Sequence, residues 1–256
     1  MKLVRYQMKN NKPSYGCIDN EEIWHVLGDP LNNYNIGDRV GRIDEIKLLV
    51  PCKPSKIIAI AINFPGIDGY SSKMLEPMVF IKPASSICAH GDIIVNPFSE
   101  LKAWGEAELG VVVKDIPKNC CINEVESGIF GFTIGNDFTV DNIENRDHHL
   151  ARSKCPDTFC PLGPWIDTEF DASDCLIEGI QNGKVIRSAR SSEQIWKWPQ
   201  IVSWLSTWMT LKPWDVILTG NPPDTVGMRY IQDSDIYTAR IEGLGELTNH
   251  YKIRNK

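Results

Sequence analysis

The sequence lacks any apolar run long enough to cross a membrane. Its longest apolar stretches, such as residues 57–62, are far shorter than the roughly 20 residues that a transmembrane helix needs. The N-terminal stretch MKLVRYQMKNN also lacks the apolar core of a secretion signal. We therefore expect a cytoplasmic protein without a membrane partner.

Basic residues are outnumbered in this chain. It has 27 lysines and arginines against 33 aspartates and glutamates, which gives a formal net charge of -6. Because non-specific nucleic-acid binding depends on a basic surface, we expect no nucleic-acid partner. The same balance would repel an anionic substrate, so a site for one requires a metal ion or a few local cations.

The eight cysteines contain no CxxC pair, the spacing typical of a structural zinc site. Without a secretion signal, free thiols are a better interpretation than disulfides, although Cys120 and Cys121 are adjacent. A chain of 256 residues buries roughly 70–75% of the surface that its unfolded form exposes, so it needs no disulfide for stability.

Prolines at positions 51 and 54 mark a boundary in the pattern of predicted elements. We divide the chain there into a small N-terminal β region, residues 1–50, and a main domain, residues 51–256. The main domain opens with the strongest predicted strand, residues 56–62, which we expect to be buried on both faces. Further strands are predicted at 2–8, 15–19, 22–27, 78–83, 92–97, 107–113, 128–137, 175–181, 184–189, 215–220 and 236–243.

Helical patterns are few. From Pro199 onward apolar residues recur at three- and four-residue spacing, which predicts one amphipathic helix, and a second candidate lies at 142–153. The dipeptide Asn182-Gly183 between two strand patterns predicts a tight hairpin. Since strands and helices do not alternate regularly, we predict an α+β, mostly β fold and not a doubly wound sheet.

The segment WGEAELGVVV, residues 104–113, carries the strongest chemical signal. Side chains two positions apart on a strand point to the same face, so Glu106 and Glu108 would project together. Two such charges repel each other unless a cation bridges them, although an isolated pair is more often a solvated strand edge. Asp137 follows the uncharged strand 128–136, where a carboxylate either caps a turn or takes part in chemistry. Three carboxylates without a nearby His or Cys suit a hard cation such as Mg²⁺, Mn²⁺ or Ca²⁺.

Candidate cations follow in the chain. Arg152 and Lys154 precede a run with three prolines, residues 155–165, which we interpret as a rigid loop that holds side chains still. Lys154 is a candidate for pairing with a substrate carboxylate or for acid–base chemistry. The default alternative is a surface lysine.

Two weaker candidates remain. Lys82, in VFIKP, follows an apolar strand pattern and is a weaker candidate for the same roles as Lys154. The turn at Gly220 and Asn221 closes another strand pattern, and its backbone N–H groups could bind an oxyanion, although most such turns are only turns.

Across residues 51–256 the chain resembles the fumarylacetoacetate hydrolase family. The matching stretches, in the family's order, are KIIAIAINF, PMVFIKPASS, GEAELGVVV, GFTIGNDFT, RSKCPDTFCPLGPWI, MTLKPWDVILTGNPP and IEGLGELTN. The resemblance implies a mixed β-roll catalytic fold, usually dimeric, after a variable N-terminal region. It also implies a Mg²⁺ or Mn²⁺ site formed by Glu106, Glu108 and Asp137, and it matches Lys154 to the family's active-site lysine.

Members of this family cleave C–C bonds of diketo acids, decarboxylate oxo acids, or isomerise and hydrate unsaturated 2-oxo acids. In each reaction the oxo and carboxylate groups of the substrate chelate the metal, which stabilises negative charge on the enolate oxygen. The resemblance therefore implies a small 2-oxo or 1,3-dioxo carboxylate as the substrate.

The sequence departs from the family directly after KIIAIAIN. Ile67 stands where the family has a catalytic histidine, and Tyr70 stands where it has a glutamate. Pro65, Gly66 and Gly69 also disfavour the short helix that carries this pair in the family. The usual activator of a hydrolytic water is therefore missing.

Other positions of the resemblance are altered too, namely Asp141, Glu144, Trp214 and Asn221. His148 and His149 are the nearest substitutes for the missing base, although adjacent histidines lie more often on a solvated face. We expect an isomerase, decarboxylase or lyase acting through a metal-bound enolate, with C–C hydrolysis as the alternative. A ligand-binding family member without turnover is the competing hypothesis.

The hypothesis assigns a role to each candidate residue. Lys154 would hold the substrate carboxylate or shuttle a proton, and Tyr70 would be a further proton donor. The predicted substrate-binding residues are Lys82, Arg152, Gly220 and Asn221. The expected assembly is a homodimer.

Overall fold

The structure is a computed structural model that describes residues 1–8, 11–227 and 230–254. Within those residues the chain is mostly β, so the predicted α+β, mostly β class is confirmed. The two α-helices are α1 (Ala151–Lys154) and α2 (Trp198–Trp208). The strands of the N-terminal region are β1 (Lys2–Tyr6), β2 (Ser14–Asp19), β3 (Glu22–Gly28), β4 (Tyr34–Arg42) and β5 (Leu48–Leu49). The later strands are β6 (Lys56–Ala61), β7 (Met78–Pro83), β8 (Ile87–Cys88), β9 (Ile93–Asn96), β10 (Ala103–Trp104), β11 (Ala107–Val113), β12 (Ile129–Asn136), β13 (Thr139–Val140), β14 (Cys160–Asp167), β15 (Leu176–Gln181), β16 (Lys184–Arg190), β17 (Val216–Leu218), β18 (Ile236–Ile241) and β19 (Gly245–Ile253).

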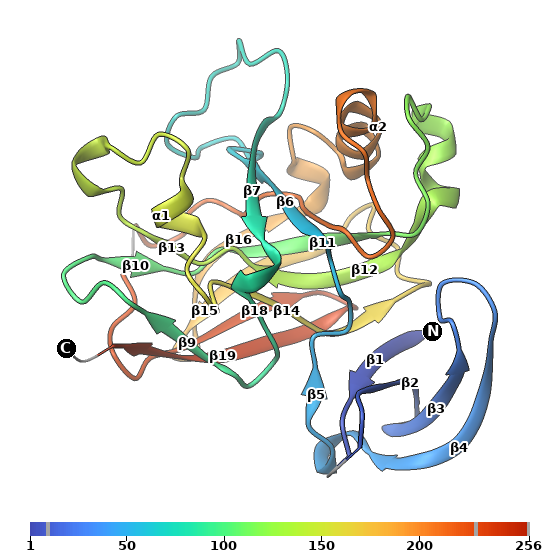
Figure 1. Ribbon diagram of the computed structural model, residues 1–256. Coiled ribbons are helices and arrows are strands. Elements are labelled where there is room, and N and C mark those ends of the chain that lie inside the picture. The colour runs from blue at the N-terminus through green and yellow to red at the C-terminus, as the bar shows by residue number, and fades with distance from the viewer. Residues whose placement is uncertain (9–10, 228–229, 255–256) are drawn as a thin grey trace.

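Two large sheets build the body of the molecule. The larger sheet has the strand order β4-β3-β2-β1-β14-β12-β11-β17-β6-β7, with β5 beside β1 and β8 beside β14. The second sheet, in the order β16-β15-β18-β19-β9, packs against it through contacts of β18 with β11 and β12. In Figure 1, β18 and β19 pass below β11 and β12, and α2 stands on the upper side.

The N-terminal strands continue the larger sheet, because β1 pairs with β14. Figure 1 shows them gathered at one side of the molecule. The division of the chain at residues 50 and 51 into two folding units stays a prediction.

Both faces of the larger sheet are buried at its centre. On β6, Ile58 and Ile60 belong to the core between the two sheets, whereas Ile57 and Ala59 belong to a second core on the opposite face. The prediction that this strand is buried on both faces is therefore confirmed. The same alternation on β11 directs Leu109 into the first core and leaves the even-numbered positions for the opposite face.

The proline-rich run at 155–165 is not the loop that its composition predicted. From Cys160 onward it forms β14, which lies between β1 and β12 in the larger sheet. The register between β12 and β14 shifts across the segment that contains Pro164. Proline is tolerated at such an irregularity because no regular ladder hydrogen bond is required there.

The candidate helix at 142–153 is largely wrong. The structure forms a 3-10 turn at Ile143–Asn145 and only four helical residues in α1. Glu144, Asn145 and Leu150 have φ angles of 51°, 55° and 57°, in the left-handed region that interrupts a right-handed helix. The helix predicted from Pro199 is confirmed as α2, which begins one residue earlier and buries Ile201, Val202 and Leu205.

The predicted hairpin at Asn182-Gly183 is also confirmed. Gln181 pairs with Lys184 across β15 and β16. Asn182 and Gly183 have φ angles of 50° and 76°, and positive φ at both central residues is the backbone that two-residue hairpins prefer.

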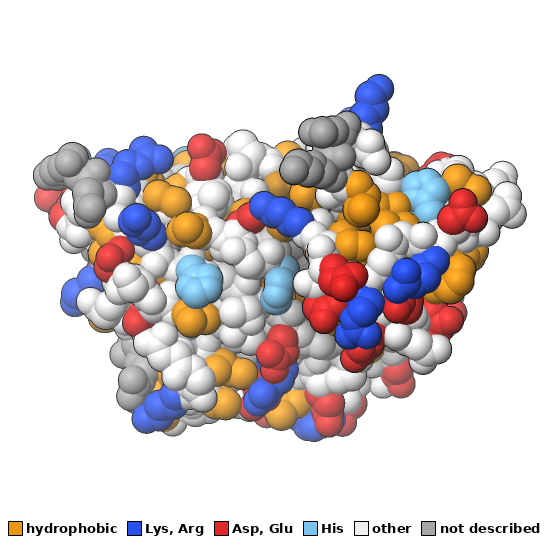
Figure 2. Space-filling model, turned by 90° about the horizontal axis from the view of Figure 1, so that it is seen from below, with side chains coloured by type: hydrophobic (Ala, Val, Ile, Leu, Met, Phe, Trp, Pro, Cys, Tyr) orange, Lys and Arg blue, Asp and Glu red, His pale blue; other side chains and the backbone are white. Residues whose placement is uncertain are grey.

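No helix among the described residues has the length and apolar character that a bilayer span requires. Figure 2 shows one face of the molecule, on which acidic and basic side chains lie next to each other and hydrophobic side chains occur in small groups.

Candidate metal centre

Glu106, Glu108 and Asp137 converge in the structure. Each side chain offers one carboxylate oxygen to a group whose members all lie within 4.8 Å of one another. Glu106 lies directly before β11, Glu108 is on that strand, and Asp137 follows the neighbouring strand β12. The antiparallel pairing of Ala107 with Asn136 therefore brings the three positions together.

Backbone contacts fix the ends of the two strands. The N–H group of Asp137 donates to the carbonyl oxygen of Glu106 at 2.9 Å. The side-chain oxygen of Asn136 accepts a hydrogen bond from the N–H group of Glu106, also at 2.9 Å. The indole N–H of Trp104 donates to Oε1 of Glu106 at 2.8 Å, which orients that carboxylate. The site is thus held by secondary structure and not by a free loop.

Glu108 is held by the turn after β17. The backbone N–H of Gly220 donates to its Oε2 at 2.6 Å. This turn requires glycine, since Gly220 has a φ of +96° and a Cβ atom there would approach Cβ of Asn63 to 2.7 Å. We predicted that Gly220 contacts substrate oxygens, but in the structure its N–H group is occupied by Glu108.

Two lysines complete the cluster, and both are buried. Nζ of Lys154, at the end of α1, donates to Oε2 of Glu106 and to Oδ2 of Asp137, each at 2.6 Å. Nζ of Lys82, on β7, donates to Oδ1 of Asp137 at 2.6 Å. Lys82 has no exposed surface and Lys154 is 7% exposed, so the surface-lysine alternative is wrong for both.

The ionisation of these groups follows from their surroundings. Burial, together with the charges of Asp137 and Glu106, raises the pKa of Glu108 well above its usual range. Burial acts in the same direction on Asp137, but Lys154 and Lys82 outweigh it and lower the pKa of that carboxyl group. Burial would lower the pKa of Lys154, yet the carboxylates of Asp137 and Glu106 raise it, so this lysine is an ammonium ion.

The donor set fits a hard divalent cation. All three candidate ligands are carboxylate oxygens, which suit Mg²⁺ and Mn²⁺, and the group includes neither His nor Cys. Formally, three carboxylates outweigh two ammonium groups by one negative charge. Glu108 is 2% exposed and, among the described residues, no ammonium group lies within hydrogen-bonding distance of it. A cation at the centre would relieve that buried charge.

A second layer of hydrogen bonds supports the turn at Gly220, and the sequence patterns did not reveal it. The side-chain amide of Asn63 donates to the carbonyl oxygen of Thr219 at 2.7 Å. The amide of Gln194 donates to Oγ1 of the same residue at 2.8 Å. Thr219 in turn donates through its N–H group to the carbonyl oxygen of Leu109 at 3.0 Å. Asn63 and Gln194 are buried. They therefore fix Thr219, the residue before Gly220, whose N–H group donates to Glu108.

The structure does not bring every predicted site residue to this cluster. Tyr70 lies on the long segment between β6 and β7 that rises from the molecule in Figure 1, and its side chain is 41% exposed. No hydrogen bond to its hydroxyl is formed within the described residues. Ile67, on the same segment, packs against the core. Arg152 is exposed and stacks on the ring of Phe98, with 4.7 Å between Cζ and the ring centroid. The predicted catalytic and substrate-binding roles of these residues stay predictions.

Asn221 has a partner that the sequence did not suggest. Its Oδ1 accepts a hydrogen bond from Nη1 of the buried Arg187 at 2.9 Å. Nη2 of Arg187 also pairs with Asp224 at 3.1 Å. His148 and His149 are exposed, as expected for a solvated face.

Known proteins share this fold. The family model described as fumarylacetoacetate (FAA) hydrolase C-terminal matches residues 56–252, and the model described as Rv2993c-like, N-terminal matches residues 1–51. Protein Rv2993c of Mycobacterium tuberculosis is 35% identical over 230 residues, which cover 88% of this chain and 84% of the relative. The mitochondrial oxaloacetate tautomerase FAHD2A of Homo sapiens is 29% identical over 229 residues, covering 80% and 69%. A solved structure described as 5-carboxymethyl-2-hydroxymuconate delta-isomerase from Mycobacterium smegmatis has 31% identity and a TM-score of 0.90, covering 99% of this chain and 100% of that one.

Proposed function

The chain belongs to the fumarylacetoacetate hydrolase family, and we propose that it is a divalent-metal-dependent enzyme acting on a small 2-oxo or 1,3-dioxo carboxylate. Its mostly β fold with mixed sheets is the fold of this family. The observation that carries the proposal is the convergence of three carboxylates with two buried lysines. The reaction is an isomerisation, a decarboxylation or a lyase reaction.

Glu106, Glu108 and Asp137 would hold Mg²⁺ or Mn²⁺. The ion, when bound, supplies a Lewis acid that stabilises negative charge on a substrate oxo oxygen. With a divalent cation the formal charge of the five side chains changes from one negative to one positive. That change supports binding of an anionic acid by a chain whose net charge is -6.

Lys154 holds a proton at Nζ beside the carboxylates. Two of the three N–H donors of its ammonium group are directed to Glu106 and Asp137. The third makes no hydrogen bond within the described residues, where Nζ lies 4.9 Å from the ring centroid of Phe80. We assign this donor to a substrate carboxylate or to a carbon or oxygen that takes up a proton. Lys82 is better suited to positioning than to the substrate contact that we predicted, because it is fully buried behind Asp137.

Isomerisation or decarboxylation is favoured over C–C hydrolysis. Hydrolysis requires a base for the attacking water, since one magnesium ion alone lowers the pKa of water too little. The segment between β6 and β7 presents Ile67 and Tyr70 where a base would be needed, and these supply neither an imidazole nor a carboxylate. The relatives named as a delta-isomerase and an oxaloacetate tautomerase support the same choice.

The test is a screen of the purified protein with Mg²⁺ or Mn²⁺ against 2-oxo and 1,3-dioxo acids, read by ultraviolet absorbance and mass spectrometry. We expect an oxo acid to be tautomerised or decarboxylated and diketones to be cleaved poorly. Lys154→Ala should abolish turnover, whereas Lys118→Ala, which removes an exposed lysine, should not. Efficient metal-dependent C–C hydrolysis would refute the reaction class. Binding of oxo acids without any turnover would favour the non-catalytic alternative.

Two further expectations accompany this proposal. The resemblance to the family implies a homodimer, which light scattering on the purified protein tests. A cytoplasmic location is the expectation from the sequence.

A further inference from the structure

A cavity lies apart from the metal centre. Its volume is about 640 Å³, within the range of small-molecule sites. Neither the three carboxylates nor the two lysines of the metal centre line it. Phe132 lines the cavity from β12 and pairs with Val111, so it points to the face of the larger sheet opposite Glu108.

Three aromatic side chains that contact one another, Phe132, Phe170 and Trp198, form one wall of the cavity. Phe132 is buried, and Phe170 and Trp198 are partly buried and pack against the same core. Phe130 also lines the cavity, but its ring packs on Trp214 in the second core. Phe132 packs edge to face against Phe170, with 6.0 Å between the ring centroids, and against Trp198, with 5.3 Å. Aromatic faces carry partial negative charge, so these rings attract a cation as well as an apolar group.

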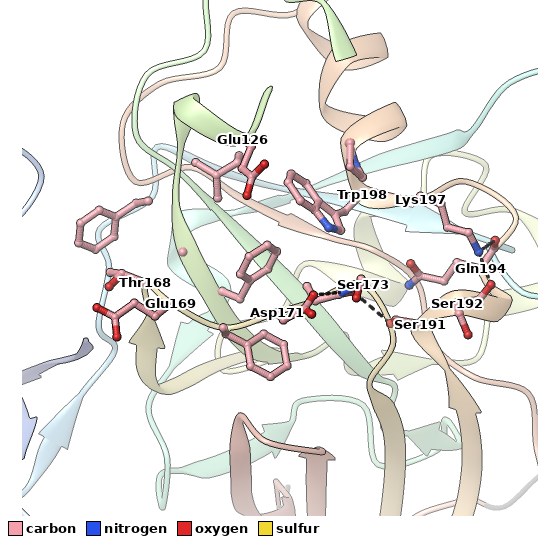
Figure 3. A pocket seen from close by; sticks show the side chains of 17 residues that line it. Glu126, Thr168, Glu169, Asp171, Ser173, Ser191, Ser192, Gln194, Lys197 and Trp198 are labelled. Carbon is pink, nitrogen blue, oxygen red and sulfur yellow. Dashed lines mark hydrogen bonds between the residues drawn. The ribbon is translucent and has the colours of Figure 1, made fainter. Parts of the chain in front are cut away.

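The charged groups at the cavity are mostly acidic. Glu126, Glu169 and Asp171 line it together with a single lysine, Lys197. The ammonium group of Lys197 donates to two backbone carbonyls of residues 192–194, and Figure 3 shows it turned toward that loop and away from the rings. Glu169 pairs with the N-terminal ammonium group at 3.0 Å.

Two carboxylates therefore remain without a cationic partner among the residues that the structure describes. Glu126 forms no ion pair there, and Asp171 accepts hydrogen bonds from Ser173, whose N–H group lies 2.9 Å from Oδ1. In Figure 3, Glu126 lies beside Trp198, and Asp171 lies lower in the view, on the same side as Ser173. A ligand in the cavity would thus meet aromatic rings and two carboxylates that have no cationic partner among the described residues.

We propose that this cavity binds a small organic ammonium ion with an apolar or aromatic body. Its body would pack on the rings, and its charge would be stabilised by Glu126, Asp171 and the aromatic faces. An organic anion of the same size would meet both carboxylates and would gain only Lys197, which already donates to two backbone carbonyls. The site is separate from the metal centre, so its test requires no turnover.

The experiment is isothermal titration calorimetry with three probes that share a phenyl ring and a similar chain. These are 2-phenylethylamine, which is a cation at neutral pH, 2-phenylethanol, which is neutral, and 3-phenylpropionate, which is an anion. We expect the cation to bind at least about fivefold more tightly than the neutral probe, and the anion to bind most weakly. The affinity for the cation should fall as the salt concentration rises.

Two variants locate the binding. Trp198→Leu should weaken cation binding about tenfold, whereas Trp208→Leu, a change on the same helix outside the cavity, should leave it unchanged. The double variant Glu126→Gln/Asp171→Asn should weaken it about three- to tenfold, with Glu124→Gln as the control. These acidic side chains are exposed, so the double variant should fold normally, which its melting temperature will verify.

Three results would overturn the proposal. The first is absence of cation binding at millimolar concentration, including the case in which a dimer of the chain covers the cavity. The second is binding of the anion as tight as that of the cation. The third is an affinity that responds equally to Trp198→Leu and Trp208→Leu.

Discussion

Substituting Glu108→Gln would separate the charge of the metal centre from its shape. The glutamine is nearly isosteric and keeps an acceptor oxygen for the N–H group of Gly220, which now donates to Glu108 at 2.6 Å. Its amide group can donate to the neighbouring carboxylates. The substitution therefore removes one buried negative charge and leaves the packing intact.

In metal-free protein this change should stabilise the fold. At an effective dielectric constant of about 20, two like charges within 4.8 Å of each other repel by roughly 3.5 kcal/mol or more. The lysines that pair with Asp137 and Glu106 offset much of this repulsion, and a carboxyl group with a raised pKa can relieve more by taking up a proton. We expect a gain of about 1 kcal/mol in the free energy of unfolding, or roughly 2–4 °C in melting temperature for a chain of this size.

With metal present, the wild-type protein should become more stable than the Glu108→Gln variant. A ligand at a hundred times its Kd stabilises the folded state by about 2.7 kcal/mol. The wild-type protein should therefore gain roughly 5–10 °C in saturating Mg²⁺. The variant has lost one of its three anionic ligands, so it should gain less than half of that.

The assay is thermal unfolding of EDTA-treated protein with and without MgCl₂ or MnCl₂, at ionic strength matched with NaCl. Glu124→Gln, which neutralises an exposed glutamate, is the control and should respond to metal as the wild type does. A Glu108→Gln protein that melts below the wild type in EDTA, yet gains as much from Mg²⁺, would refute the reasoning.

Three further predictions test the groups that surround the carboxylates. Lys82→Met should lower the free energy of unfolding of EDTA-treated protein by roughly 3 kcal/mol, because Asp137 loses one of two buried partners; a loss below about 1 kcal/mol in urea unfolding would contradict this. Gln194→Ala should weaken Mg²⁺ binding about three- to tenfold in calorimetry, because Thr219 is no longer fixed. An unchanged affinity would show that the hydrogen bond from Gln194 to Thr219 does not contribute to metal binding. Asp215→Ala should cost about 3 kcal/mol or more of stability, since the fully buried carboxylate accepts from three backbone N–H groups and a lysine. That variant should still bind metal normally, and a matching loss of metal affinity would refute a purely structural role.

Much of the fold could be predicted where a single hydrophobic periodicity or a single turn motif dominates the local sequence. The strand at 107–113 was predicted with the bounds that β11 has, because its apolar run is bounded by charged residues. The grouping of Glu106 with Glu108 was also predicted, although β11 begins at Ala107. Contacts from Asn136 to the Glu106 backbone hold that residue in line with the strand.

The errors arose where tertiary pairing outweighs local preference. β14 contains two prolines, which favour a loop, yet its neighbours on both sides are strands of the larger sheet. The strand β4 was missed because most of its residues are exposed and its pattern is polar. Lys82 is the most instructive case among the site residues. Its sequence position at the end of an apolar run gives no sign that it is fully buried, since its partner Asp137 lies 55 positions further along the chain.

The two lysines explain how such a centre can fold before a metal ion arrives. Three carboxylates held together, two of them buried and one partly buried, would otherwise favour unfolding or protonation. Lys82 and Lys154 each donate to a different oxygen of Asp137, so this carboxylate is fully paired in the absence of metal. Glu106 shares Lys154, whereas Glu108 receives only the N–H group of Gly220. Glu108 is therefore the carboxyl group whose ionised form is least compensated, in line with its raised pKa, and it is where a divalent cation gains most. The sequence pattern reveals the ligands, but the electrostatic balance that makes them compatible with folding is visible only in three dimensions.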